Sequence, residues 1–382
     1  MSSFSFSCPT QVLFGAGTCE KLAGLLPKDA ERVVLVRGRS GGASSPVRAL
    51  LHAAGLDVTE LNCDGEPTVT SIDAALDMLA TIQADAVIAC GGGAAIDTGK
   101  VVCFALSNKL LDYDDFASLT PEQMDTRCLI PFFALPTTAG TGAEVTANAV
   151  IGVPAKDAKI SLRGRGLCPS VAIVDPDLMR GAPDTVLLHS GLDAVTQVFE
   201  SFTSNVATPF SDALTQSVKD KGLPALKRAL DDNDSSALDD LAWVSHVSGL
   251  ALANSGLGAV HGLASVIGGR FDAPHGALCG RLLLPVMQQN LMRAPQGSKI
   301  HARLASCVDH IAAVFPPIEK TDPLSGYGAW LDTKGLPRLA DWLAAEDDLA
   351  SLATQGMAAS SSQKNAVPLN EADYLRVLSA AL

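Results

Sequence analysis

The sequence is short of positive charge, and this limits its partners. Lys and Arg number 28 against 41 Asp and Glu, so the formal net charge of the 382 residues is −13. An acidic surface repels the phosphates of nucleic acids and the head groups of anionic membranes. We therefore expect neither a nucleic acid nor a membrane as a partner.

Cysteine pairs and a targeting segment are also missing. The nine cysteines form no CxxC motif, and an odd, scattered set is typical of reduced thiols in the cytosol. The N-terminal stretch MSSFSFSCPTQ has neither a basic segment nor a long apolar run, which argues against a signal peptide. The apolar stretch 247–269 contains Asn254 and His261, and this predicts a buried helical hairpin rather than a membrane span. We expect a cytoplasmic protein.

The composition is that of an ordinary globular protein, and the two halves of the chain show different sequence patterns. Apolar residues make up 47% and charged residues 18%, and the length suggests two domains. Over residues 1–180, β-branched runs such as RVVLVRG and DAVIAC alternate with helical segments, which predicts an α/β domain with a mostly parallel sheet. Residues 181–382 are rich in Ala and Leu at helical spacing, as in DTVLLHSGLDAVTQVFESFTS and YGAWLDTKGLPRLADWLAAED, and predict an all-helical domain.

A glycine turn is the first candidate for ligand binding. The stretch DAVIACGGGAAIDTGK (85–100) leads from a buried strand through three glycines into a helix. Backbone N–H groups at such a helix start can approach a pyrophosphate, and Asp97 in the first turn suits the helix dipole. A plain tight turn is the alternative, since the motif is neither the G-x-G-x-x-G fingerprint nor a P-loop. GAGTCE (15–20) is a weaker candidate for the same role.

A threonine-rich loop is the second candidate. PTTAGTGAEVT (136–146) follows another expected strand and offers four hydroxyl groups among glycines. Two such loops at the carboxyl edge of one parallel sheet would form a crevice of the kind in which ligands bind. The alternative is a simple turn rich in threonine.

A helix face in the second half raises the question of a metal. In GLDAVTQVFE (191–200), Asp193 and Gln197 lie four residues apart, so both side chains project from one helix face. Paired ligands use this spacing, but a neutral amide is a poor ligand where an imidazole or carboxylate is usual.

Together these stretches resemble the iron-containing (group III) alcohol dehydrogenase family. The resemblance rests on PTQVLFGAGTCEKL, GGGAAIDTGK, PTTAGTGAEVT, AIVDPDLM, GLDAVTQVFES and VHGLASVIGGRFDAPHGALCGRLLLP, in this order. It implies a dinucleotide-binding α/β domain followed by an all-α domain, in the dehydroquinate synthase-like architecture. It also implies a nicotinamide cofactor, a catalytic divalent metal in the cleft between the domains, and a homodimer or larger homo-oligomer.

The resemblance assigns cofactor contacts to the α/β half. They are Gly38, Gly91, Gly92, Gly93, Ala94, Asp97, Thr137, Thr138, Thr141, Thr146, Asn148, Lys159 and Leu178. Relatives that prefer NAD often carry an acidic residue after the RVVLV-type strand, where this chain reads VRGRS. With Arg37 and Arg39 there and no carboxylate in this stretch, we expect NADP(H) to be accepted as well as NAD(H). The alternative is that both guanidinium groups are solvated surface charges.

The metal ligands implied by the family are one Asp and three His. The matching positions are Asp193, Gln197, His261 and His275. Two imidazoles and a carboxylate suffice for Fe²⁺ or Zn²⁺, whereas Gln197 in place of a His should weaken binding by about 10–100-fold. Ser265, one turn after His261, stands where many relatives have another His thought to assist proton transfer.

The resemblance implies hydride transfer between a nicotinamide and a small alcohol or aldehyde, assisted by the metal. Asp193, His261, His275 and Ser265 are the expected catalytic residues. Three alternatives stay open. One is a metal-independent reductase of the maleylacetate reductase type, and another is a non-catalytic protein that binds the cofactor. The third is a lyase of the dehydroquinate synthase type, for which only Arg270 and Arg281 are nearby basic residues.

Overall fold

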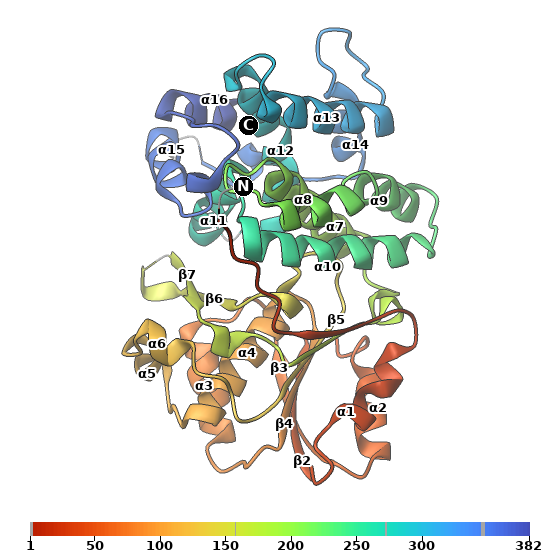
Figure 1. Ribbon diagram of the computed structural model, residues 1–382, viewed down its shortest axis with the longest axis vertical. Helices are drawn as coiled ribbons and strands as arrows, with labels where there is room; N and C mark the ends of the chain where they lie inside the picture. Colours follow the sequence, from red (N-terminus) through yellow and green to blue (C-terminus); the bar gives the residue numbers. More distant parts are fainter. Residues whose placement is uncertain (1–2, 157, 272, 345–347) are drawn as a thin grey trace. The chain divides into compact units, whose positions relative to one another are not determined.

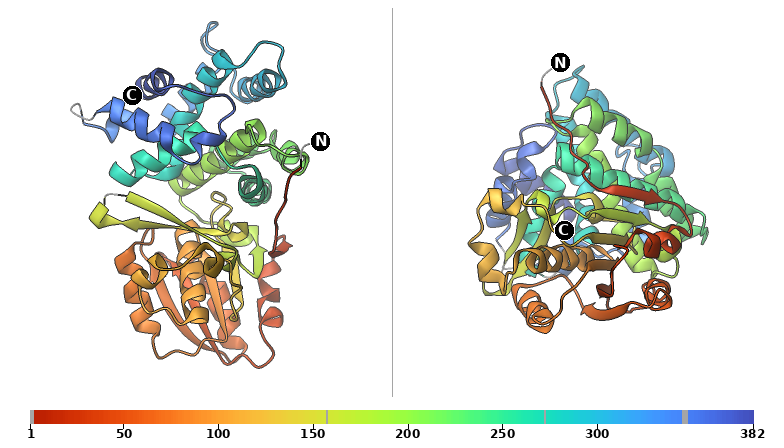
Figure 2. Two further views of the ribbon diagram at one scale, coloured as in Figure 1. Left: turned by 60° about the vertical axis from the view of Figure 1, so that its left-hand side comes forward. Right: turned by 60° about the horizontal axis from the view of Figure 1, so that its bottom comes forward.

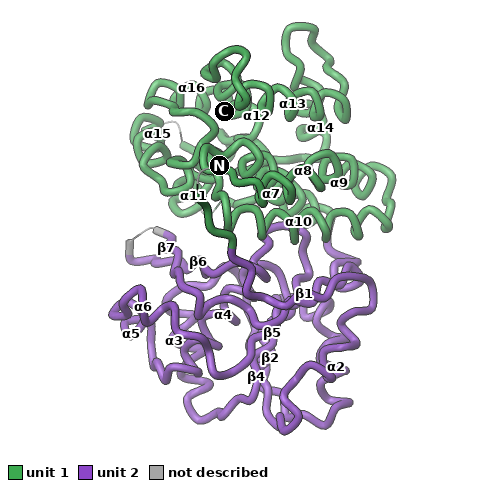
Figure 3. The backbone as a smooth tube through the Cα atoms, in the orientation of Figure 1, with its two compact units in different colours: residues 1–6, 184–382 green, residues 7–183 purple. Residues whose placement is uncertain are grey.

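The protein divides into two compact units. The structure, a computed structural model, describes residues 3–156, 158–271, 273–344 and 348–382. One unit is Ser7–Pro183, and the other is Asp184–Leu382 together with Met1–Phe6 (Figure 3). These units differ from the expected ranges 1–180 and 181–382 mainly at the N-terminus. The difference arises because the rings of Phe4 and Phe6 lie 5.8 and 5.1 Å from that of Phe210 in the helical unit.

The α/β unit contains a six-stranded sheet in which every described strand pair is parallel. The strand order is β1-β8-β5-β4-β2-β3, which confirms the expected α/β architecture. The strands are β1 (Gln11–Phe14), β2 (Arg32–Gly38), β3 (Asp57–Cys63), β4 (Ala86–Gly91), β5 (Phe132–Pro136) and β8 (Val171–Val174). The helices of this unit are α1 (Leu22–Leu25), α2 (Ser45–Ala53), α3 (Val69–Leu79), α4 (Gly93–Asn108), α5 (Tyr113–Ala117) and α6 (Pro121–Met124).

Helices cover both faces of this sheet (Figures 1 and 2). Along β2, Val33 and Leu35 pack with Leu22 of α1 and Val47 of α2, whereas Val34 packs on the opposite face with residues of α4. Such strands are apolar on both faces, which explains why RVVLVRG and AVIACG read as continuous apolar runs. The carboxyl ends of β4 and β5 lie side by side, because Gly91 pairs in register with Pro136.

A separate antiparallel hairpin follows the threonine-rich loop. Its strands are β6 (Asn148–Val153) and β7 (Ala158–Arg163). The sequence analysis did not predict these strands. The hairpin places Asn148 and Lys159 on a small two-stranded ribbon outside the main sheet.

The second unit is helical, as expected, and its helices are broken more often than the sequence suggested. They are α7 (Asp184–Thr203), α8 (Pro209–Val218), α9 (Gly222–Asp231), α10 (Ala237–Ser255), α11 (Ala259–Phe271), α12 (His275–Arg293), α13 (Lys299–Val314), α14 (Ser325–Thr333), α15 (Leu349–Ala358) and α16 (Glu371–Ala381). The pattern in YGAWLDTKGLPRLADWLAAED does not form one helix. Instead α14 ends at Thr333, because Gly335 adopts a positive φ of 67° and Pro337 follows.

The apolar stretch 247–269 spans α10 and α11. The chain bends by 100° between the two helices, at the break around Gly256. The helices therefore form a corner, and the prediction of a helical hairpin is wrong. Among the described residues, no single helix is long and apolar enough to cross a membrane. This pair meets the criteria of length and composition only when both helices are counted together.

Candidate metal centre and cofactor loops

Three helices of the helical unit bring four donor side chains together. Asp193 comes from α7, His261 from α11, and His275 and Cys279 from α12, and their donor atoms all lie within 4.8 Å of one another. His261 Nε2 lies 3.2 Å from Asp193 Oδ1, and His275 Nε2 lies 3.8 Å from the same oxygen. The Sγ atom of Cys279 lies 3.7 Å from each imidazole Nε2. The structure therefore gathers three of the four expected ligands and adds a thiol that the sequence analysis missed.

Two glycines of α12 allow this helix to approach α7 closely. A Cβ at Gly276 would lie well inside contact distance of the His189 carbonyl oxygen, and one at Gly280 would lie 2.5 Å from Leu192 Cδ1. Because His275 and Cys279 are four residues apart, the face of α12 that meets α7 presents both of them near Asp193.

A second carboxylate orients one imidazole. Glu200 Oε2 lies 2.6 Å from His261 Nδ1, and Glu200 Oε1 accepts the Val260 backbone N–H at 2.7 Å. Since a carboxylate accepts hydrogen bonds, Nδ1 carries the proton, which leaves Nε2 free to coordinate a cation. Glu200 is buried and lies seven residues after Asp193, on the same face of α7. That spacing was the available sequence signal for this residue.

The electrostatics of the cluster favour a cation at its centre. Burial opposes protonation of His261, but the neighbouring Cys279, Glu200 and Asp193 outweigh it and raise the His261 pKa well above its usual value. Burial also works against ionisation of Asp193, yet the two imidazoles lower its pKa overall. These opposite shifts show that the surroundings stabilise positive charge beside the carboxylate. The donor types, distances and charges thus fit a divalent metal.

The remaining residues predicted for this centre have other surroundings. Gln197 is buried, and its Oε1 accepts a hydrogen bond of 2.6 Å from Ser248 Oγ on α10. Ser265 lies one turn after His261 on α11 and is exposed.

In the α/β unit, the glycine turn and the threonine-rich loop contact each other. The Thr137 N–H donates to the Gly91 carbonyl at 3.0 Å. A Cβ at Gly92 would lie 3.3 Å from Thr138 Oγ1, and one at Gly93 would lie 2.9 Å from Thr141 Oγ1. Helix α4 begins at Gly93, and no side chain among the described residues caps its N-terminus. The structure therefore places bare N–H groups of a 16-residue helix beside threonine hydroxyls, an arrangement suited to a phosphate.

A buried lysine that the sequence analysis did not single out joins these loops to the hairpin. Lys100 Nζ donates to Thr146 Oγ1 at 2.9 Å and to the Asn148 carbonyl at 2.6 Å, and it lies 3.5 Å from Asp97 Oδ1. Asp97 Oδ2 accepts the Val150 N–H at 2.9 Å. Burial lowers the pKa of Lys100, and the charge of Asp97 opposes that shift. Asp97, Thr146 and Asn148 thus hold the loops in place through contacts within the protein.

The other expected cofactor residues are spread over the same unit. Gly38 ends β2 beside Gly91, and the Ala94 carbonyl in the first turn of α4 accepts from Thr98 Oγ1 at 2.9 Å. Lys159 pairs with Glu66 at 2.5 Å. Leu178 is buried in the apolar core beside β5 and β8.

A carboxylate also accompanies the first arginine of VRGRS. Arg37 Nε lies 2.5 Å from Glu60 Oε2 on β3, so Arg37 is paired with a carboxylate, which the alternative of a solvated surface charge did not foresee. A carboxylate of the neighbouring strand β3 thus lies beside the end of β2.

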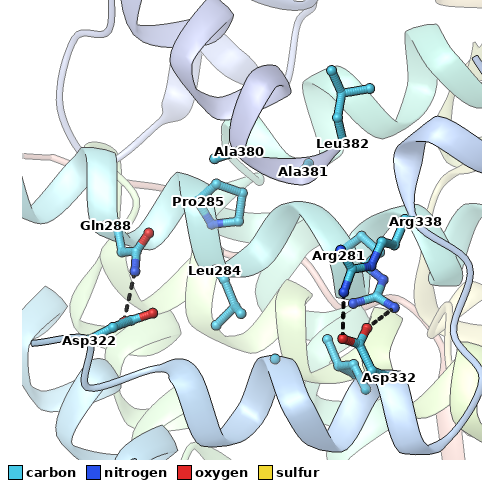
Figure 4. A pocket seen from close by; sticks show the side chains of 12 residues that line it. Arg281, Leu284, Pro285, Gln288, Asp322, Asp332, Arg338, Ala380, Ala381 and Leu382 are labelled. Carbon is cyan, nitrogen blue, oxygen red and sulfur yellow. Dashed lines mark hydrogen bonds and ion pairs between the residues drawn. The ribbon is translucent and has the colours of Figure 1, made fainter. Parts of the chain in front are cut away.

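A surface pocket of about 240 Å³ in the helical unit is distinct from the donor cluster. Figure 4 shows that the Asp332 carboxylate in this pocket bridges Arg281 and Arg338, at 2.6 and 2.8 Å. Arg281, one of the two basic residues that a dehydroquinate synthase-type lyase would have at hand, is therefore already paired.

We predict that Glu200→Gln weakens metal binding by about 10–100-fold, because supporting carboxylates of ligating histidines have effects of this size. The glutamine can still accept the Val260 N–H but leaves His261 less firmly oriented. Competition for Zn²⁺ with a chromophoric chelator measures the affinity. Glu122→Gln, on exposed α6, is the matched control. Equal affinities for the two variants would contradict an orienting role for Glu200.

We predict that Gly276→Ala destabilises the protein by about 1–3 kcal/mol, the usual cost of overpacking, and also lowers metal affinity. The new methyl group would force the start of α12 away from α7 and displace His275. Urea denaturation and the same chelator assay measure both effects. Gly328→Ala on α14 is the control: its Cβ would make an ordinary contact of 3.5 Å with Leu284, and alanine favours a helix. A Gly276 variant as stable as this control would refute the close-packing argument.

Comparison with known proteins places the chain in a family. Residues 9–176 match the family described as iron-containing alcohol dehydrogenase, and residues 187–382 match its C-terminal family. Alcohol dehydrogenase 4 of Saccharomyces cerevisiae strain YJM789 is 30% identical over 334 residues, which are 84% of each chain. The NAD-dependent methanol dehydrogenase of Bacillus methanolicus is 30% identical over 291 residues, 74% of each chain.

Solved structures have the same fold. The iron-containing alcohol dehydrogenase of Thermococcus thioreducens superposes with a TM-score of 0.83 at 24% identity, covering 99% of both chains. An alcohol dehydrogenase from Oenococcus oeni gives 0.83 at 25% identity over 100% of both chains. With family matches over both units and relatives aligned along most of its length, the chain belongs to the iron-containing alcohol dehydrogenase family.

Proposed function

We propose that the protein is a metal-assisted, nicotinamide-dependent alcohol dehydrogenase or aldehyde reductase that acts on small substrates. The observation that carries the proposal is the cluster of buried Asp193, His261 and Cys279 with half-buried His275, in which Glu200 orients the imidazole of His261. Family membership gives this cluster its chemical context. A metal-independent reductase would have no use for four converging donors.

Asp193, His261 and His275 would hold the divalent metal, which when bound acts as a Lewis acid on the substrate oxygen. The side chains are already arranged for this role without a substrate. Asp193 supplies the negative charge, Glu200 fixes the ring of His261, and the first turn of α12 positions His275. The exposed hydroxyl of Ser265, one turn from His261, would pass protons to water.

The glycine turn and threonine-rich loop would hold the nicotinamide cofactor, which supplies the hydride chemistry. The uncapped N–H groups at Gly93 and Ala94 would donate hydrogen bonds to a phosphate, with Thr138 and Thr141 alongside. The network of Asp97 and Lys100 would keep this surface rigid, and Asp97 stays a proposed cofactor contact. Both NAD and NADP would be used, with Arg39 next to the 2′-phosphate of NADP.

The nine cysteines include no disulfide among the described residues, which supports a reducing, cytoplasmic setting for the protein. We further propose a homodimer or larger homo-oligomer, as the family resemblance implies.

The first test is a screen of small primary alcohols with NAD⁺ and NADP⁺, before and after chelation and re-addition of Fe²⁺ or Zn²⁺. We predict turnover that chelation abolishes and metal restores. His261→Ala should lower kcat/KM at least about 100-fold, since a Lewis acid contributes several kcal/mol, and exposed His52→Ala should not. Turnover that survives complete metal removal would indicate a maleylacetate reductase type of enzyme. Cofactor binding without any turnover would indicate a non-catalytic relative.

The second test concerns cofactor choice. Glu60→Gln removes the carboxylate beside Arg37, and we predict that it raises kcat/KM for NADP⁺ relative to NAD⁺ about three- to fivefold. This is the size expected for a partly exposed charge pair worth up to ~1 kcal/mol. Glu31→Gln, at the opposite end of β2, is the control and should leave the ratio unchanged. An unchanged ratio in the Glu60 variant would show that this strand end does not face the 2′-phosphate.

A further inference from the structure

We propose that Cys279 is the fourth protein ligand of the metal centre, in place of Gln197, and that the resulting ligand set selects zinc over iron. The proposal rests on the metal of the proposed function and names the ligand and the ion more closely.

The distances in the cluster match a tetrahedral zinc site. With Zn–N of about 2.0–2.1 Å and Zn–S of about 2.3 Å, tetrahedral geometry separates nitrogen from sulfur by about 3.5–3.6 Å and oxygen from nitrogen by about 3.3–3.5 Å. The two sulfur–nitrogen distances are both 3.7 Å, and the two oxygen–nitrogen distances are 3.2 and 3.8 Å. These four of the six donor–donor distances thus lie within about 0.5 Å of the tetrahedral values, and all six are within 4.8 Å, so one ion can be shared by Asp193, His261, His275 and Cys279 once the side chains close around it.

The amide of Gln197 is used elsewhere. Its oxygen, the only atom of the side chain that can coordinate a cation, accepts a hydrogen bond from Ser248 Oγ, and both residues are buried. Turning this oxygen to an ion would break that hydrogen bond and leave the Ser248 hydroxyl to the Ser245 carbonyl, 2.7 Å away, in exchange for coordination by a weak amide ligand. Helix α7 thus offers the ion Asp193 alone, and α12 supplies the pair His275 and Cys279.

The charge and softness of a thiolate point to zinc. Asp193 and Cys279 are 3% and 0% exposed, so a thiolate ligand would place a second negative charge directly against the ion, with the Glu200 carboxylate behind His261 as a third in the surroundings. Thiolates also favour zinc among the common divalent metals, whereas sites of imidazole and carboxylate ligands alone are found with either zinc or iron.

Cobalt substitution tests the proposal without turnover. The full-length protein, stripped of metal and loaded with Co²⁺, should show the near-ultraviolet charge-transfer band that a thiolate ligand produces. Cys279→Ser should abolish that band and weaken Zn²⁺ binding at least about 10–100-fold, as loss of even a supporting group does. Cys307→Ser, which alters another fully buried cysteine on α13, should keep both properties. Gln197→Ala should also keep the band and bind Zn²⁺ within about threefold of the unmodified protein.

The outcomes separate this inference from the proposed function. If the unmodified protein lacks the band but oxidises alcohols with metal, the ligand assignment is wrong and the function stands. If the band is present but no alcohol is oxidised, the ligand assignment stands and the function is wrong. Loss of affinity in Gln197→Ala but not in Cys279→Ser would restore Gln197 as the ligand. Preference for Fe²⁺ over Zn²⁺ in direct competition would overturn the zinc assignment. Should Cys279→Ser fail to fold, the band of the unmodified protein still decides.

Discussion

The close packing of α12 against α7 is the constraint on which the metal centre depends. Helices that pack through ordinary side chains lie about 8–10 Å apart, and any Cβ at Gly276 or Gly280 would push these two apart. Without this close packing, the donor side chains of α12 could not reach Asp193. The glycines carry no chemistry, yet they decide whether two ligands from one helix and one from another can share an ion. Function here is set by backbone approach as much as by the ligating side chains.

Glu200 also contributes to both the fold and the candidate site through a single carboxylate. It accepts an N–H at the start of α11, where the helix dipole favours a negative charge, and it holds the ring of His261. The N-terminus of α11 is therefore fixed by the same group that fixes the imidazole. A change that loosened this helix start would also loosen the ligand, so stability and metal affinity are coupled through Glu200.

Much of the architecture could be predicted from the sequence because its signals are local. The strands of the parallel sheet are short apolar runs, and the glycine turn follows one of them directly. The hairpin at 148–163 was missed because its strands are short and lie outside the main sheet. Helix ends were misjudged where a glycine with positive φ interrupts an otherwise helical pattern, as at Gly335. Contacts between residues far apart in the sequence could not be predicted. No local pattern shows that Lys100 forms hydrogen bonds to Thr146 and Asn148, which follow it by 46 and 48 positions.

Cys279 shows why the search for ligands by motif was incomplete. Spacing between cysteines indicates no metal site in this chain, whereas the informative spacing is that of Cys279 to His275, four residues earlier on the same helix. Gln197 by itself indicates a weakened ligand set, because the family resemblance implies ligands at fixed positions. In three dimensions the requirement is only that enough donors converge. A ligand lost from α7 can be supplied from α12, provided that the released side chain finds a partner, as Gln197 does in Ser248. On the proposed assignment, the glutamine at 197 and the thiol at 279 are therefore two parts of one arrangement, in which the thiol coordinates and the glutamine bonds to Ser248.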